Sequence, residues 1–140
     1  MFAAALLLLA AAQPSPPPSP AEALRRAERL ADADRFGEAE PLLRAALGTD
    51  DRFLKRQAFN RLVGLYVRSG RPDKALHTGD ALRAWLKVVG DPDGPGELEL
   101  LTAQCHLDLG YPDAADQALG AALGAHPPLP ADRRLDALRL

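Results

Sequence analysis

Three short segments of this chain resemble one another, and their spacing is the strongest constraint on its fold. They are residues 34–40 (DRFGEAE), 70–76 (GRPDKAL) and 110–116 (GYPDAAD), and each reads as a tight turn that leads into the start of a helix. The segments align on alanines at positions 39, 75 and 115, so the successive periods are 36 and 40 residues. Self-similarity at such a period is typical of an array in which each repeat is one small structural unit.

The residues around these turns predict two helices in each unit. Ser19, Pro20 and Glu22 match the capping-box pattern that begins a helix, and Pro72 and Pro112 stand where the second helix of a later unit would begin. The aligned alanines fall where two helices of a hairpin would meet. A small side chain permits a close approach there, whereas a larger one would push the helices apart.

The composition favours helices throughout. Alanine and leucine make up more than a third of the 140 residues, isoleucine is absent, and valine and threonine are scarce. Helices favour Ala, Leu, Arg and Glu, whereas strands favour β-branched and aromatic residues. We therefore expect an all-α chain of antiparallel helix pairs. The net charge of −2 provides no strong positive field, so nucleic acid is not an expected partner.

The N-terminal segment differs from the rest of the chain. Residues 1–12 hold an apolar run that ends in three alanines, which is typical of a cleavable signal peptide and too short to span a bilayer. The run lacks a basic residue before it, so either the signal is minimal or the true start lies upstream; the alternative is a buried N-terminal helix. Residues 13–20 (QPSPPPSP) predict an extended spacer. We expect export to the periplasm or beyond, no stable membrane span, and a folded domain over residues 21–140.

The chain is similar to the tetratricopeptide repeat (TPR) family over about residues 20–140. The resemblance implies a solenoid of about three degenerate helical hairpins and a C-terminal capping helix. One departure is Gly79, which stands where the family usually has a large apolar residue. The residues that carry the resemblance are Ala27, Leu30, Ala39, Leu43 and Ala46 in the first unit, Phe59, Leu62, Tyr66, Gly70 and Ala75 in the second, and Ala103, Gly110, Ala115, Leu119, Ala122 and Pro127 in the third.

The end of the chain has the pattern of that capping helix. Pro130 occupies a helix-starting position, and Ala131, Leu135 and Leu138 follow at intervals that place them on one apolar stripe. A terminal element of a repeat array needs an apolar inner face and a polar outer face. We therefore expect this stripe to cover the last helix of the third unit.

Residues that could carry chemistry do not form a catalytic or metal-binding pattern. Cys105 and His106 are adjacent, so on a helix they point about 100° apart and cannot serve each other as nucleophile and base. His77 and His126 lie in other elements, without the spacing of metal ligands. Residues 91–97 (DPDGPGE) look like a calcium loop, but the twelfth position is Thr102 rather than the required glutamate. We predict no catalytic residue, no cofactor and no metal.

In TPR proteins the ligand usually lies along a concave face formed by the first helix of each hairpin. The resemblance therefore implies a mixed, polar binding face. The subtype that grips a C-terminal carboxylate is not expected, because Leu24, Glu28, Glu97 and Leu101 stand where that clamp would need Lys or Asn. The residues of the implied face are Glu28, Asp32, Gln57, Asn60, Gly64, Arg68, Gln104 and Asp108.

These features predict a non-catalytic interaction module, an adaptor or scaffold that binds a protein or peptide of unknown identity in the cell envelope or outside the cell. One alternative is half of a scaffold, which self-associates or completes a larger repeat assembly. The other is a small exported enzyme that uses Cys105. Thiol labelling separates the last of these from the others, since a working nucleophile must be accessible.

Overall fold

The computed structural model describes residues 14–90, 95–124 and 131–139, and these residues contain helices and no strand. The all-α prediction is therefore confirmed. The predicted signal peptide at residues 1–12, the calcium-like segment from Asp91 to Gly94, and His126, Pro127 and Pro130 lie outside the described residues. The helices are α2 (Pro20–Asp32), α3 (Phe36–Ala46), α4 (Arg52–Arg68), α5 (Pro72–Val89), α6 (Pro95–Asp108), α7 (Pro112–Leu123) and α8 (Ala131–Arg139).

The start of α2 follows the predicted capping box. The backbone N–H of Glu22 donates to Ser19 Oγ at 3.3 Å, and the backbone N–H of Ser19 donates to Glu22 Oε2 at 3.0 Å. Residues 14–19 are exposed and not helical, as expected for a proline-rich spacer. Pro20 ends the proline-rich segment and is also the first residue of α2, as the capping-box pattern predicts.

The three turns inside the hairpins have the same hydrogen bonds. In each, a backbone N–H after the turn donates at 2.8 Å to a carbonyl near the end of the preceding helix: Arg35 to Leu30, Arg71 to Tyr66, and Tyr111 to His106. The residue before each donor has positive φ, and these residues are Asp34 (57°), Gly70 (68°) and Gly110 (80°). The 6→1 bond and the left-handed residue are those of a Schellman motif.

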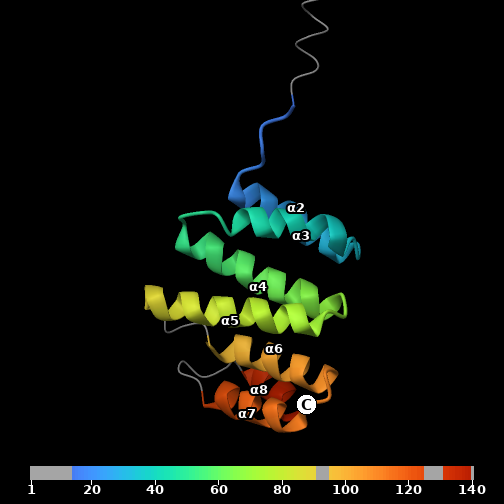
Figure 1. Cartoon of the computed structure of the whole chain (residues 1–140), viewed down its shortest axis with the longest axis vertical. Helices are drawn as coiled ribbons and strands as arrows, with labels where there is room; N and C mark the ends of the chain where they lie inside the picture. The colour runs from blue at the N-terminus through green and yellow to red at the C-terminus, as the bar shows by residue number, and fades with distance from the viewer. Residues whose placement is uncertain (1–13, 91–94, 125–130, 140) are drawn as a thin grey trace, which may run out of the picture.

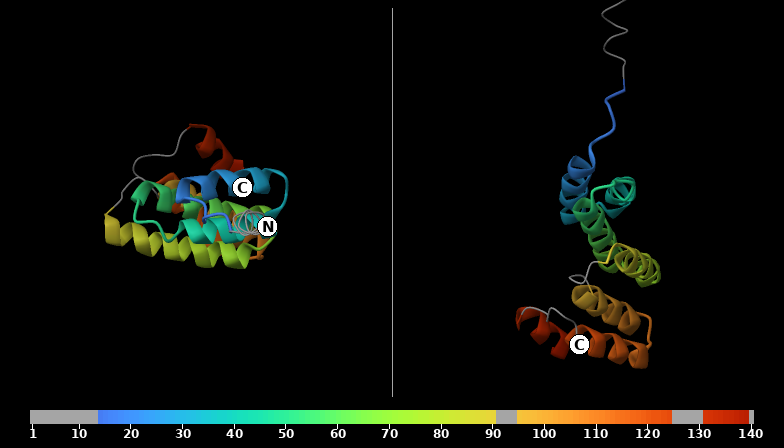
Figure 2. Two further views of the ribbon diagram at one scale, coloured as in Figure 1. Left: turned by 90° about the horizontal axis from the view of Figure 1, so that it is seen from above. Right: turned by 90° about the vertical axis from the view of Figure 1, so that its left-hand side faces the viewer.

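Helices α2 to α7 stack along the long axis of the molecule in chain order, and α8 lies beside α7 (Figure 1). The tight turns pair α2 with α3, α4 with α5, and α6 with α7, and each pair packs together. Between pairs, α3 packs on α4 and α5 on α6, while α2 contacts α4 and α4 contacts α6. In side view, α2 and α4 lie on one side of the stack and α3 and α5 on the other, while α7 lies below α6 (Figure 2).

The core runs through all three pairs. The alanines at the predicted close contacts are fully enclosed, with Ala39 and Ala115 at 0 % exposure and Ala75 at 1 %. The first hairpin and the second share a cluster that includes Leu24, Leu43 and Tyr66, and Cys105 of α6 joins the same cluster. The alanines on which the three sequence segments align therefore lie in the packed core, where a larger side chain would push the helices apart.

A second cluster joins the middle pair to α6. Leu82 and Leu86 of α5 are buried with Leu98 of α6, and Phe59 and Trp85 pack against them. The rings of Phe59 and Trp85 lie 6.0 Å apart between centroids, tilted by 34°. Gly79 of α5 is buried as well: a Cβ built there would lie 3.3 Å from Leu98 Cδ1. The glycine thus lets α5 approach α6 closely where a larger residue would prevent it.

A partly buried carboxylate, that of Glu40, links α3, α4 and the start of α5. Glu40 Oε1 accepts hydrogen bonds from the Tyr66 hydroxyl at 2.7 Å and from Arg44 Nε at 3.1 Å, and Glu40 Oε2 accepts one from Arg71 Nη1 at 2.9 Å. The hydrogen bond from Tyr66 and those from the two arginines lower the pKa of Glu40 to about 2, although burial acts in the opposite direction. Burial and the adjacent Glu40 raise the pKa of the Tyr66 hydroxyl, so this group stays a neutral donor.

Helix α8 packs on α7, but its apolar residues do not all face inward. Ala131 is exposed and Leu138 is 71 % exposed, so the predicted inward placement of these two residues is wrong. The side chain of Leu135 lies outside the described part. Arg133 Nε lies 3.9 Å from Glu97 Oε1, near the start of α6. A nine-residue helix has only about two and a half turns, and a loose contact leaves its outer positions open to solvent.

Candidate functional site

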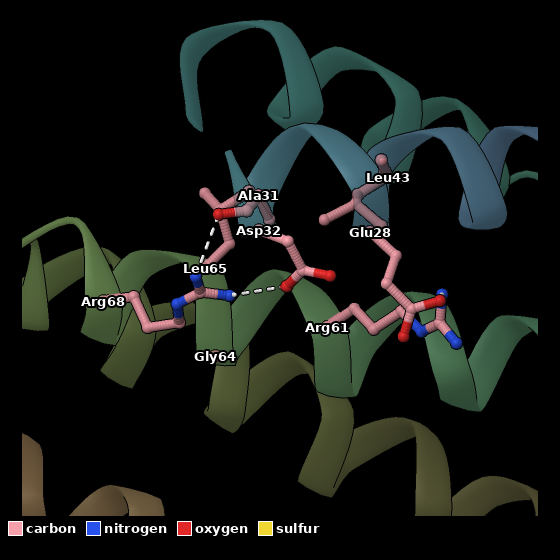
Figure 3. Close-up of a pocket in the computed structure, with 9 residues that line it drawn as sticks. Glu28, Ala31, Asp32, Leu43, Arg61, Gly64, Leu65 and Arg68 are labelled. Atoms are coloured by element: carbon pink, nitrogen blue, oxygen red, sulfur yellow. Dashed lines mark hydrogen bonds and ion pairs between the residues drawn. The ribbon is translucent and has the colours of Figure 1, made fainter. Parts of the chain in front are cut away.

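A cavity of about 180 Å³ lies where α2 crosses α4, and its floor is apolar (Figure 3). Gly64 of α4 has no side chain, and open space would surround a Cβ built there. Residues three or four apart share a face of a helix, which is why a few positions on each helix line the same hollow. We call this surface the α2–α4 groove. Its lining residues are Ala27, Glu28, Ala31, Asp32, Leu43, Arg61, Gly64, Leu65 and Arg68.

Arg61 closes one end of the α2–α4 groove. Its Nη1 donates to the backbone carbonyl of Leu24 at 3.1 Å and to Glu28 Oε2 at 3.1 Å. The arginine is therefore held against α2 by both a backbone and a side-chain acceptor. Its guanidinium retains further N–H donors, because five are available and one nitrogen makes both bonds.

Arg68 closes the other end. Its Nη2 donates to the carbonyl of Ala31 at 2.9 Å, and its Nη1 lies 3.6 Å from Asp32 Oδ1 (Figure 3). The carbonyl belongs to the last turn of α2, where it also accepts from the backbone N–H of Asp34 at 3.0 Å. A positive charge is favoured at this end of a helix. Asp34 Oδ1 lies 3.9 Å from Arg68 Nη2, and the guanidinium carbon lies 5.5 Å from the centroid of the Phe36 ring.

The charges around the α2–α4 groove balance, with two arginines opposite two carboxylates. Between them the floor is made of the side chains of alanine and leucine. Pockets that enclose drug-sized molecules usually measure about 300–1,000 Å³, so this hollow has room for a side chain rather than a whole ligand of that size. Its geometry suits one apolar side chain of a peptide whose polar groups reach the rim.

The structure brings together only part of the predicted binding face. Glu28, Asp32 and Arg68 line the cavity, as does Gly64. Gln57 and Asn60 lie earlier on α4, where they do not line it; Gln104 and Asp108 lie on α6. There, Gln104 Nε2 donates to Asp108 Oδ1 at 2.9 Å.

Sequence reasoning missed Arg61 and the apolar floor. Arg61, Gly64 and Arg68 are spaced by three and four residues, so their common face could have been found from the helical period alone. Leu43 could not have been found in this way, because it comes from α3 and reaches the cavity only through the packing of α3 between α2 and α4.

The residues considered for chemistry lie apart from this groove. Cys105 is 1 % exposed, and burial raises the pKa of its thiol to about 11. Such a thiol stays protonated at neutral pH and is a poor nucleophile. The adjacent His106 is half-buried, and its Nδ1 has no hydrogen-bond partner among the residues that the structure describes. Among the described residues, no three His, Cys, Asp or Glu side chains gather as a metal-binding group.

No protein-family model, curated protein or solved structure matches this chain. Within the ranges that the structure describes, no helix combines the length and the apolar character needed to cross a bilayer.

Proposed function

We propose that the chain is a TPR-like adaptor, a short solenoid of helical hairpins that binds a protein or peptide partner in the α2–α4 groove. The observation that carries the proposal is the cavity over Gly64, with its apolar floor between two arginine–carboxylate pairs. The equivalent turns at Asp34, Gly70 and Gly110 support the repeat architecture. An extended peptide could place one apolar side chain over Gly64 and hydrogen-bond to the rim with its backbone.

The test compares two glycines that lie on different helices. Gly64→Leu fills the α2–α4 groove, whereas Gly120→Leu adds the same side chain at an exposed position of α7, where open space also surrounds the added Cβ. Both substitutions raise helix propensity by a similar amount, so neither should unfold the chain. Peptides are selected from a random-sequence display library on the unaltered protein, and their Kd values are measured by fluorescence anisotropy.

We expect Gly64→Leu to raise the Kd of the selected peptides by about tenfold or more, because one side chain of the peptide can no longer be buried in the groove. Gly120→Leu should bind as the unaltered protein does. The proposal is wrong if the library yields no binder, or if both leucine variants bind the selected peptides equally well.

We further propose that the protein acts after export, in the cell envelope or outside the cell. The support is the pattern of residues 1–12 together with the exposed proline-rich stretch that precedes α2. N-terminal sequencing of the protein from its native host should find Gln13 as the first residue. A full-length product in the cytosol would contradict export, but it would not contradict peptide binding in the α2–α4 groove.

A scaffold that self-associates is the second candidate, and the exposed Leu138 on α8 favours it. Leu123 of α7, the helix on which α8 packs, is 42 % exposed as well. Exposed apolar side chains that gather into one patch form a surface that a second copy could cover. Leu138→Asp would then lower the mass measured by light scattering at high protein concentration. An unchanged, monomeric mass in both proteins would remove this candidate.

A further inference from the structure

A second cavity, of about 300 Å³, lies where α3, α4 and α5 meet, and it shares no residue with the α2–α4 groove. Its size falls at the lower end of small-molecule pockets. Most of its lining side chains carry hydrogen-bond donors or a positive charge. They are Arg44, Tyr66, Asp73, Lys74, His77 and Thr78, and we call this site the α3–α5 pocket.

Thr78 is the unusual member of the lining. The residue is 8 % exposed, yet its hydroxyl forms no hydrogen bond with any residue that the structure describes. Thr102, also within a helix, donates its Oγ1 proton to the Leu98 carbonyl at 2.8 Å. The Thr78 hydroxyl is not one of the enclosed polar atoms without a partner, so it is open to the solvent in the pocket. A bound acceptor would take the place of that solvent as its hydrogen-bond partner.

The cations of the pocket are held around the Tyr66 ring. Arg44 Nη2 donates to the Tyr66 hydroxyl at 2.9 Å, and the Lys74 ammonium lies 5.8 Å from the ring centroid. Glu40 forms ion pairs with both Arg71, at 2.9 Å, and Arg44, at 3.1 Å, so the two arginines share one carboxylate. With Lys74 and the lining acid Asp73, the cluster therefore keeps one positive charge in excess.

We propose that the α3–α5 pocket binds a small molecule that carries an oxyanion, a phosphate or carboxylate group, between Arg44, Lys74 and Thr78. Arginine and lysine supply charge-assisted hydrogen bonds, and the threonine hydroxyl supplies a neutral donor that faces solvent in the free chain. Asp73 opposes the anion and limits its affinity. This proposal is independent of peptide binding in the α2–α4 groove.

The experiment titrates the full chain with sodium phosphate, and in parallel with sodium acetate, at constant ionic strength, and follows amide chemical shifts by NMR. Saturable shifts are expected around residues 73–78 and Arg44. The anion whose chemical-shift changes saturate at the lower concentration is the oxyanion that the pocket prefers. Shifts that grow linearly with both anions, without saturation, would overturn the proposal.

Matched variants then test each role. Thr78→Val should lower the affinity for the preferred anion about tenfold, because one hydrogen bond to a charged group is lost. Thr102→Val, whose hydroxyl already has a partner, should leave the affinity unchanged. Lys74→Gln should weaken binding, whereas Lys87→Gln, an exposed change on the same helix outside the pocket, should not.

The decisive variant is Asp73→Asn, which should tighten binding by about twofold to fivefold because it removes the repelling charge. Equal affinity in the Thr78→Val and unaltered proteins, or no gain with Asp73→Asn, would overturn the proposal. Thermal melting provides the folding control. Thr78→Val should melt no lower than the unaltered protein, since it removes a hydroxyl that forms no hydrogen bond with the described part of the free chain.

Discussion

Asp34 adopts the left-handed backbone conformation that glycines adopt at the two equivalent turns. Any side chain is disfavoured there, because its Cβ approaches the following carbonyl oxygen. We expect Asp34→Gly to raise the free energy of unfolding by about 0.5–1 kcal/mol, less a small loss from the exposed pair with Arg68. Urea denaturation measures the change. Gly70→Ala should lower stability by a similar amount, and an increase there would show that the turns are not equivalent.

Glu40 makes the stability of the fold depend on pH. A glutamate titrates near 4.3 in an unfolded chain, and the hydrogen bonds from Tyr66, Arg71 and Arg44 hold its pKa at about 2 in the fold. Because the folded value is the lower one, the stabilisation is fully present above about pH 5 and is lost as the pH falls toward 2. We expect this residue to account for a loss on the order of 3 kcal/mol across that window.

Urea denaturation at a series of pH values checks this dependence on Glu40. Glu40→Gln should be less stable at neutral pH, because it leaves the two arginines without their carboxylate. It should also lose less stability than the unaltered protein between pH 5 and pH 2. Parallel curves for the two proteins would mean that other carboxylates cause the acid sensitivity.

At the scale of the helix pair, the enclosed alanines set how closely two helices approach. Ala115→Leu should cost about 1–3 kcal/mol, because α7 would have to move away from α6 to admit the larger side chain. Ala121 lies on the same helix and is exposed, so Ala121→Leu should change stability little. Equal losses from the two substitutions, measured by chemical denaturation, would show that the assigned helix face is wrong.

Between the second helix pair and the third, Gly79 sets how closely α5 approaches α6. Gly79→Leu should cost about 1–3 kcal/mol by overpacking against Leu98, and Leu98→Ala about 2–5 kcal/mol by leaving a cavity. The double variant should lose less than the two single losses together, by about 1 kcal/mol or more, because the added side chain fills the space that the deletion leaves. Strictly additive losses in this double-mutant cycle would show that positions 79 and 98 do not interact.

The helices could be predicted because their signals are local. Ser19 with Glu22, Pro72 and Pro112 mark helix starts, and these marks depend only on neighbours in the chain. The helical period alone did not predict the orientation of Leu138, because the way in which α8 rests on α7 decides which side reaches solvent. The place of Leu43 in the groove floor could not be predicted either, because it depends on how α2, α3 and α4 pack together.

Over the whole molecule, packing runs mainly between elements that are close in the chain, from α2 and α3 through α4 and α5 to α6 and α7. In such an arrangement the stability of each pair depends on its immediate neighbours. The two arginines that hold α2 to α4 act at one of these junctions, so a peptide in the α2–α4 groove would contact the first pair and the second at once. We expect binding there to stabilise that junction and to leave α7 unaffected.

The contact between Phe59 and Trp85 gives the chain a built-in optical reporter. Trp85 is the single tryptophan, and it lies against the cluster shared by α4, α5 and α6. Its emission therefore follows the middle of the stack, whereas far-ultraviolet circular dichroism averages over every helix. If the ends fray before the centre, the ellipticity will fall at a lower denaturant concentration than the fluorescence changes. Coincident transitions would show that the whole stack unfolds as one cooperative unit.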